Sequence, residues 1–301
     1  MFVRLFRKLF KKSKTDTPSI KELVNKAIDN IDKIYNGKID GLIKGVPSGF
    51  KDLDLLTSGF DKGDLILVAG RPAMGKSTFA LSITRYLTIY EKVPVLFFSL
   101  QMGREELVQK LLCLHAKVDM HKVRTGFLSG TDWPRLTAGA GEISHIPLFV
   151  DDTSIININE LYRRACRIKK EKNIKLIIID YLQLMVDQDN TEKRKNKLTE
   201  ISRMLKELAE RLQIPIIVTS QLSRKADFRK GHRPSLCDLR DSGSIELNAD
   251  KVFLLFREEY YDPNAENQNR AEVIVAKNRT GPVGSVYLKF LKSYMRFEDI
   301  S

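Results

Sequence analysis

The residues best suited to chemistry form one glycine-framed run, Gly70-Arg71-Pro72-Ala73-Met74-Gly75-Lys76-Ser77. The pattern G-x-x-x-x-G-K-S is typical of a loop that cradles phosphates, because glycines let backbone N–H groups turn inward without a Cβ in the way. In such a loop Lys76 neutralises the β and γ phosphates, and Ser77 offers its hydroxyl to Mg²⁺. We therefore expect ATP and Mg²⁺ as cofactors, with residues Gly70 to Thr78 binding ATP.

The residues around this run favour a true phosphate-binding loop over a chance match. The apolar stretch 65–69 predicts a strand before the loop, and residues 78–83 predict a helix after it. A helix that begins there directs its positive N-terminus at the phosphates.

The carboxylate that must hold the metal ion is predicted at Asp180, which ends the apolar run 176–179. An aspartate at the carboxyl end of a central strand faces the ligand crevice. The alternative is a turn residue after a strand. The mostly apolar continuation over residues 181–184 argues against that alternative, so we expect Ser77 and Asp180 to be the metal-site residues.

Apolar runs that alternate with helical patterns from about residue 50 onwards predict the elements that position these side chains. This alternation is typical of an α/β fold with a mainly parallel, helix-covered sheet. The expected strands are 65–69, 95–99, 148–150, 176–180, 214–220, 251–256 and 271–277, and helices are expected to begin near residues 76, 104, 159 and 192.

Two segments precede this region. Residues 1–16 form a basic amphipathic segment, whose first 14 residues carry six positive side chains and no negative one. Such a helix can bind anionic lipid, DNA or a partner's groove, or pack within its own oligomer. Residues 17–44 predict an amphipathic helix from Ser19 to Tyr35 followed by a connection, and its apolar face must find a surface on this chain or on a neighbour.

Composition narrows the class of protein. A length of 301 residues fits one large domain with a small appendage, and the formal charge of +13 fits either a nucleic-acid partner or a generally basic surface. The three cysteines are far apart, without the spacing of a zinc site. No apolar run approaches the roughly 20 residues of a membrane span. We expect a cytoplasmic protein.

Several motifs then succeed one another in order: GVPSGF at 45–50, the glycine-framed run at 70–77, IDYLQLM at 179–185, DLRDSGSIE at 238–246 and KNRTGP at 277–282. Together they resemble the motor domain of DnaB-type replicative helicases, and the resemblance covers residues 45–301. It implies a RecA-like fold and a ring-shaped hexamer that hydrolyses ATP between subunits. It also implies translocation along single-stranded DNA with 5′ to 3′ polarity, with a helicase loader or primase as further partners.

The resemblance assigns roles to further residues. Gln221 resembles the sensor of the γ-phosphate, and Lys277 with Arg279 resembles the pair that reaches into the neighbour's ATP site, Arg279 as the arginine finger. Without the resemblance, these two cations would read as an exposed pair at a strand end.

DNA contacts are expected from the segment 224–240, which the sequence predicts to be a basic loop. The candidate DNA-binding residues are Arg224, Lys225, Arg240, Asp241 and Gly243, the last three by resemblance. The alternative is a solvated basic loop.

Two departures from the family stand out. Gln101 follows Phe-Ser-Leu where the family carries a glutamate that polarises the attacking water, and a glutamine cannot take up the proton. Losing a general base costs roughly 10²- to 10⁴-fold in rate, so we expect a chain that binds ATP and hydrolyses it slowly. The region before residue 45 is also shorter than the family's globular N-terminal domain. The alternative functions are an ATP-binding scaffold on DNA, a RecA-like recombinase and a membrane-associated ATPase.

Overall fold

The computed structural model describes residues 19–35, 45–185, 191–242, 245–262 and 267–300. The chain divides into two compact units, residues 1–42 and 43–301. In the first unit the expected amphipathic helix is present as α2, Ile20–Tyr35. Ser19 caps it, because its hydroxyl accepts from the Glu22 N–H at 3.3 Å and its own N–H donates to the Glu22 carboxylate at 2.9 Å. The predicted basic segment 1–16 lies outside the described residues.

In the second unit, the described residues form a nine-stranded sheet with the order β3-β2-β4-β5-β1-β6-β7-β8-β9. The strands β3, β2, β4, β5, β1 and β6 run parallel, and β7 to β9 continue the sheet antiparallel. The bounds are β1 Leu65–Gly70, β2 Val95–Ser99, β3 Leu148–Asp151, β4 Leu176–Asp180, β5 Ile216–Gln221, β6 Lys251–Phe256, β7 Arg270–Asn278, β8 Gly284–Leu291 and β9 Arg296–Asp299.

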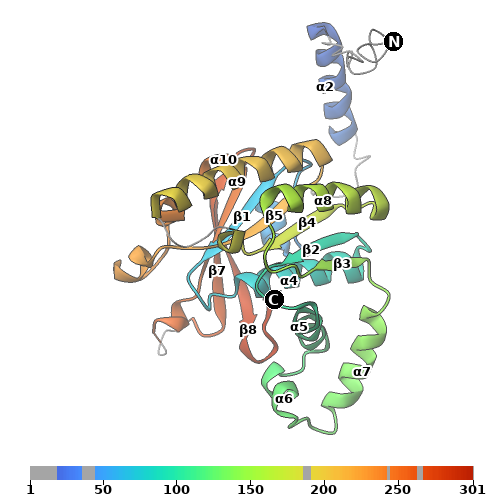
Figure 1. Ribbon diagram of the computed structural model, residues 1–301, viewed down its shortest axis with the longest axis vertical. Helices are drawn as coiled ribbons and strands as arrows, with labels where there is room; N and C mark the ends of the chain where they lie inside the picture. The colour runs from blue at the N-terminus through green and yellow to red at the C-terminus, as the bar shows by residue number, and fades with distance from the viewer. Residues whose placement is uncertain (1–18, 36–44, 186–190, 243–244, 263–266, 301) are drawn as a thin grey trace, which may run out of the picture. The chain divides into compact units, whose positions relative to one another are not determined.

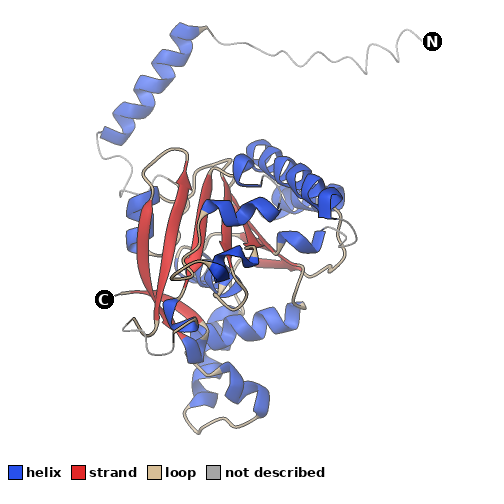
Figure 2. Cartoon of the chain, turned by 90° about the vertical axis from the view of Figure 1, so that its left-hand side faces the viewer, coloured by secondary structure: helices blue, strands red, loops and turns tan. Residues whose placement is uncertain are grey.

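Helices cover both faces of this sheet (Figures 1 and 2). The α-helices described in this unit are α3 Lys51–Thr57, α4 Lys76–Arg85, α5 Arg104–Ala116, α6 Met120–Thr125, α7 Asp132–Ile143, α8 Ile158–Lys172, α9 Thr191–Leu212 and α10 Ile245–Asn248. A five-residue π-helix, Tyr86–Tyr90, extends α4. Short 3₁₀ helices are η2 Leu182–Met185, η3 Arg224–Phe228, η4 Leu236–Ser242, η5 Glu258–Tyr260 and η6 Lys292–Tyr294.

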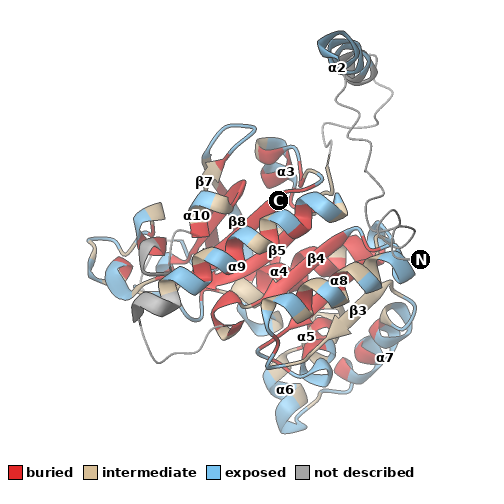
Figure 3. Ribbon diagram, turned by 45° about the horizontal axis from the view of Figure 1, so that its top comes forward, coloured by how far each residue is buried: buried red, intermediate tan, exposed pale blue. Residues whose placement is uncertain are grey.

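The core has two halves because side chains alternate along each buried strand. In β1, Leu65 and Leu67 join the cluster under α8, α9 and α10, whereas Ile66 and Val68 join the cluster under α3, α4 and α5. Figure 3 shows the buried strands β4 and β5 beneath α8 and α9, whose outward surfaces are exposed. Among the described residues, no helix combines the length and the apolar composition that a membrane span requires.

The expected mainly parallel, helix-covered α/β sheet is confirmed, and all seven expected strands are present. Most bounds agree to within one residue; the largest difference is at β5, which begins at Ile216 and not at residue 214. The Ile214 N–H donates to the Ala209 carbonyl of α9 at 3.3 Å, and Pro215 has no N–H to donate to a neighbouring strand. Strands β8 and β9 and helices α3, α6, α7 and α10 were not predicted.

The segment 224–240 also differs from the expected loop, because most of it is folded into the 3₁₀ helices η3 and η4. The hydroxyl of Ser223 accepts from the Lys225 N–H at 3.2 Å at the start of η3, and the carboxylate of Asp238 accepts from the Ser235 N–H at 2.8 Å before η4. These local side-chain bonds satisfy backbone donors that a loop would leave to water.

Candidate functional site

The glycine-framed run joins the carboxyl end of β1 to the first residue of α4, as expected. Ala73 and Gly75 take left-handed backbone conformations, with φ of 63° and 95°. A Cβ on Gly75 would come within 3.0 Å of the Phe297 ring, so only glycine fits there. The loop therefore has the tight turn that brings backbone N–H groups around an anion.

Lys76 lies within this loop and holds it together. Its ammonium donates to the carbonyls of Gly70 at 3.0 Å and Arg71 at 3.1 Å. Burial lowers the pKa of Lys76 to about 8; Asp180 opposes that shift, and Arg71 adds to it. A phosphate group would supply the negative charge that this buried ammonium lacks.

Asp180 ends β4 and is 1% exposed. One carboxylate oxygen, Oδ1, accepts from the Thr219 hydroxyl, whereas Oδ2 is buried and has no hydrogen-bond partner among the residues that the structure describes. A buried carboxylate oxygen without a partner is costly unless a cation or a bridging water binds it. This oxygen, the Ser77 hydroxyl and phosphate oxygens together fit the few protein ligands that Mg²⁺ requires.

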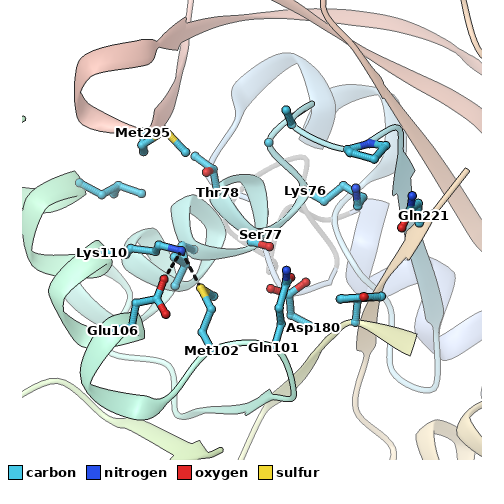
Figure 4. A pocket seen from close by; sticks show the side chains of 16 residues that line it. Lys76, Ser77, Thr78, Gln101, Met102, Glu106, Lys110, Asp180, Gln221 and Met295 are labelled. Carbon is cyan, nitrogen blue, oxygen red and sulfur yellow. Dashed lines mark hydrogen bonds and ion pairs between the residues drawn. The ribbon is translucent and has the colours of Figure 1, made fainter. Parts of the chain in front are cut away.

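These residues share one cavity of about 480 Å³ (Figure 4). Its wall includes Pro72, Ala73, Gly75, Lys76, Ser77, Thr78, Gln101, Asp180 and Gln221 from the expected set, and Leu81, Met102, Glu106, Lys110, Leu114, Tyr181 and Met295 in addition. The volume and the polar floor suit a nucleotide. Arg71 and Met74 point elsewhere: Met74 is buried in the core, and Arg71 is bound to Asp227.

Gln101 lies at the position that the resemblance implied. The Leu100 N–H donates to the carbonyl of Asp180 at 2.8 Å, and the Ser99 hydroxyl donates to the carbonyl of Met102 at 2.7 Å, so both sides of Gln101 are fixed. The amide therefore enters the cavity beside Asp180 and the loop (Figure 4). An amide there can orient a water molecule but cannot accept its proton.

Glu106 lines the same cavity from α5, but its carboxylate is paired with the Lys110 ammonium at 2.8 Å. Lys110 also donates to the Met102 sulfur at 2.8 Å. Figure 4 shows this group on the far side of the cavity from Gln221. Glu106 is thus paired with a cation of its own helix, Lys110.

Gln221 ends β5, directly beside Gly70 in the sheet register. Its position is set by Gln183, a buried residue of η2: the Gln183 amide donates to Ser220 Oγ at 2.8 Å and to the Gln221 carbonyl at 3.2 Å, and its oxygen accepts from the Gln221 N–H at 3.3 Å. No role was predicted from the sequence for Gln183, Ser99 or Thr219. The partners of Gln183 and Thr219 are distant in sequence and come within reach only through the sheet.

Lys277 and Arg279 do not join this cavity. They lie at the end of β7, where Asn278 pairs with Lys251, the first residue of β6. Lys277 donates to the Glu246 carbonyl at 2.7 Å, and the Arg279 guanidinium is 70% exposed and 3.4 Å from the Asp250 carboxylate. Both cations therefore lie at the end of the sheet where β1 begins, opposite the carboxyl end of β1.

The candidate DNA-binding residues fall into two groups. Arg224 and Lys225 are exposed on η3. Arg240 and Asp241 lie on η4, with side chains outside the described part of the structure, and Gly243 lies outside the described residues.

Two other arginines of the segment 224–240 are used within the fold. Arg229 pairs with Asp238 at 2.9 Å, and Arg233 pairs with Glu272 at 2.7 Å. The basic charge of the segment is thus partly neutralised by neighbouring carboxylates.

Comparison with known proteins places this geometry in a family. Residues 45–299 match the family model for the DnaB-like helicase C terminal domain. The chain is 42% identical over 283 residues to the replicative DNA helicase DnaC of Bacillus subtilis (strain 168), an alignment that covers 94% of this chain and 62% of that protein. The replicative DNA helicase DnaB of Geobacillus stearothermophilus matches with the same identity and coverage. The chain thus spans about 62% of the length of these curated relatives.

Solved structures agree with this placement. A DnaB-like replicative helicase, described together with its interactions with primase, superposes with a TM-score of 0.85 at 34% identity, covering 100% of this chain and 71% of that chain. A solved ATPase domain superposes with a TM-score of 0.86 at 36% identity, covering 95% of this chain and 100% of that one. The RecA-like fold expected from the motifs is confirmed.

Proposed function

The chain belongs to the family of DnaB-like helicase C-terminal domains, and we propose that it is the ATP-driven motor of a replicative DNA helicase. One observation carries this proposal: Lys76, Asp180 and Gln221 line one cavity, while Arg279 is exposed at the opposite end of the strands. A site divided in this way suits a ring in which each nucleotide lies between two subunits.

ATP would bind with its phosphates in the loop 70–78, against Lys76 and the N-terminus of α4. Ser77 and Asp180 would hold Mg²⁺, which when bound neutralises charge on the β and γ phosphates. Gln221 would then contact the γ-phosphate, held in position by its hydrogen bonds with Gln183. Gln101 would orient the attacking water next to the same phosphate.

The proposed arginine finger would come from another subunit, because Lys277 and Arg279 lie far from the cavity of their own chain, at the other end of the strands. A guanidinium supplied in trans stabilises the charge of the transition state and is worth roughly 10³- to 10⁵-fold in rate. We infer a homohexamer, with α2 packed on the adjacent subunit as a linker helix. Ile20, Leu23, Val24 and Ile28 are exposed within α2, which leaves an apolar face for that contact.

Single-stranded DNA is the proposed track, followed with 5′ to 3′ polarity. Arg224 and Lys225 would contact phosphates without reading bases, and Arg240, Asp241 and Gly243 remain candidates for the same role. A loader or a primase are the proposed protein partners, and the cytoplasm is the proposed location. The three cysteines are free thiols, in keeping with a reducing compartment.

A second candidate function follows from Gln101: a ring that holds ATP and DNA but hydrolyses slowly, acting as a scaffold. Strand displacement separates the two. A forked duplex with a 5′ single-stranded tail is incubated with the protein, ATP and Mg²⁺. The motor proposal expects unwinding that Gln101→Glu accelerates and Lys76→Met abolishes. Tight binding of DNA and ATP without unwinding in either the parent chain or Gln101→Glu would favour the scaffold.

A further inference from the structure

The phosphate-binding loop is joined by a salt bridge to the segment that carries the proposed DNA-binding cations. Arg71, the second residue of the loop, faces Asp227 of η3 with both arms of its guanidinium: Nε lies 3.0 Å from Oδ1 and Nη2 lies 2.6 Å from Oδ2. The side chains are 14% and 30% exposed. Paired, partly buried contacts of this kind are among the stronger ones in proteins and fix direction as well as distance.

Arg71 also binds the chain just after Gln221. Its third nitrogen, Nη1, donates to the Leu222 carbonyl at 2.9 Å, and the Leu222 N–H donates to the Gly70 carbonyl at 3.2 Å. The carbonyl of Arg71 itself accepts from the Lys76 ammonium. One residue therefore touches Lys76 through its backbone, and both the end of β5 and η3 through its side chain.

Asp227 is held on its other side by aromatic residues. The Tyr261 hydroxyl donates to Oδ1 at 2.8 Å, and the His232 ring, 2.8 Å from the Asp227 carbonyl, stacks on Tyr261 with ring centroids 4.3 Å apart. Burial works to raise the pKa of Asp227, but hydrogen bonds from Arg71 and Tyr261 outweigh it and leave that pKa below its ordinary value. The carboxylate is thus negative at neutral pH and fixed in place.

The exposed cations Arg224 and Lys225 lie on the same short helix, three and two residues before Asp227 respectively. A displacement of η3 by bound DNA would be carried to Arg71 through two hydrogen-bonded contacts. Phosphates in the loop would in turn bias the position of η3. Such an effect between two sites is reciprocal by thermodynamic necessity.

We propose that Asp227 is a positioning residue that couples the two sites: through Arg71 it makes the affinity for single-stranded DNA depend on nucleotide in the loop. This inference rests on the proposed function, since it needs DNA at η3. It predicts that breaking the pair leaves both ligands bound but makes their binding independent.

The test measures DNA affinity with and without nucleotide, so that it does not depend on hydrolysis. Fluorescence anisotropy of a labelled oligo-dT is recorded with and without a non-hydrolysable ATP analogue and Mg²⁺. For the parent chain we expect the two dissociation constants to differ by at least about fivefold, the lower end of typical coupling. Asp227→Asn presents an amide N–H₂ to an arginine that has only donors, so one arm of the contact is lost.

We expect the nucleotide-free DNA affinity of Asp227→Asn to stay within about twofold of the parent chain. The ratio of its two DNA dissociation constants, without and with the ATP analogue, should fall towards one. Asp227→Glu, which keeps the carboxylate, should retain the ratio. The matched control is Glu160→Gln on α8, since Glu160 is 28% exposed and also pairs with arginine, and it should behave as the parent chain.

Three results would overturn the proposal: a parent ratio near one, an unchanged ratio in Asp227→Asn, or an Asp227→Asn variant whose nucleotide-free DNA binding collapses. The last would make Asp227 a structural anchor only. Failure of the proposed function is recognised separately, because the parent chain would then bind no single-stranded DNA under either condition.

Discussion

Lys76 and Arg279 lie at opposite ends of the strands of the same sheet. Lys76 follows the carboxyl end of β1, whereas Arg279 follows Asn278, whose partner Lys251 pairs with Ile66 near the start of β1. The length of a strand separates them. The two charges that the family resemblance assigns to one ATP site therefore lie apart within a single chain, and we infer that a complete site would be formed by two chains.

Nucleotide affinity should fall at alkaline pH. Burial places the pKa of Lys76 at about 8, so above that pH the free loop carries a neutral amine that must take up a proton when phosphates bind. We expect the dissociation constant of a fluorescent ATP analogue to be flat from about pH 7.5 to 8 and then to rise by up to about tenfold per pH unit. Lys76→Met should bind weakly with no such rise. A pH-independent parent chain between 7.5 and 9.5 would refute this role for Lys76.

Replacing Gln101 by glutamate should restore a proton acceptor beside the γ-phosphate. We expect DNA-stimulated ATP hydrolysis to increase roughly 10²- to 10⁴-fold in Gln101→Glu, with ATP affinity little changed. The rate of hydrolysis is measured as steady-state phosphate release. Gln109→Glu adds the same charge on α5, at a residue that does not line the cavity, and should have no effect. An unchanged rate in Gln101→Glu would contradict the assignment.

Arg224 and Lys225 should contribute to DNA binding through charge alone. Each phosphate contact on a single strand adds about 0.7 to the slope of log affinity against log salt, so Arg224→Ala with Lys225→Ala should reduce that slope by about 1.4. The loss should be the same for all base sequences. Arg167→Ala with Lys170→Ala, two exposed cations of α8, is the control. Equal slopes in both double variants would show that η3 does not contact DNA.

Removing residues 1–36 should dissociate the proposed ring, because α2 then no longer covers a neighbour. Light scattering of the full chain with ATP analogue should give the mass of a hexamer, and that of the shortened chain a monomer. Leu23→Ser with Ile28→Ser tests the same apolar face without shortening the chain. A shortened chain that still forms hexamers would exclude the linker role.

The predictable part of this protein is what local sequence encodes. Alternation of apolar runs and helical patterns is enough to predict the central strands, and the glycine-framed run identifies the loop between β1 and α4. Asp180 was found because its strand reads as apolar up to a single carboxylate. The strand β8 could have been found as well, since Val286, Leu288 and Phe290 alternate with exposed or half-buried residues.

What could not be predicted depends on partners that are distant in sequence. Gln183 holds Gln221 only because β4 and β5 are adjacent in the sheet. The segment after β5 is rich in cations, and its sequence alone predicts a basic loop. Its Arg229 and Arg233 are nevertheless bound by carboxylates, one of them on β7. Which charges remain available to a ligand is decided by tertiary contacts.

The division of the ATP site between two chains is tested most directly by mixing inactive variants. In a Gln101→Glu background, Lys76→Met lacks the loop lysine and Arg279→Ala lacks the finger, so each alone should hydrolyse ATP at a small fraction of the parent rate. If the sites form between subunits, an equimolar mixture regains activity, because intact Lys76 of one chain meets intact Arg279 of another. A mixture no more active than the sum of its parts would contradict a shared site.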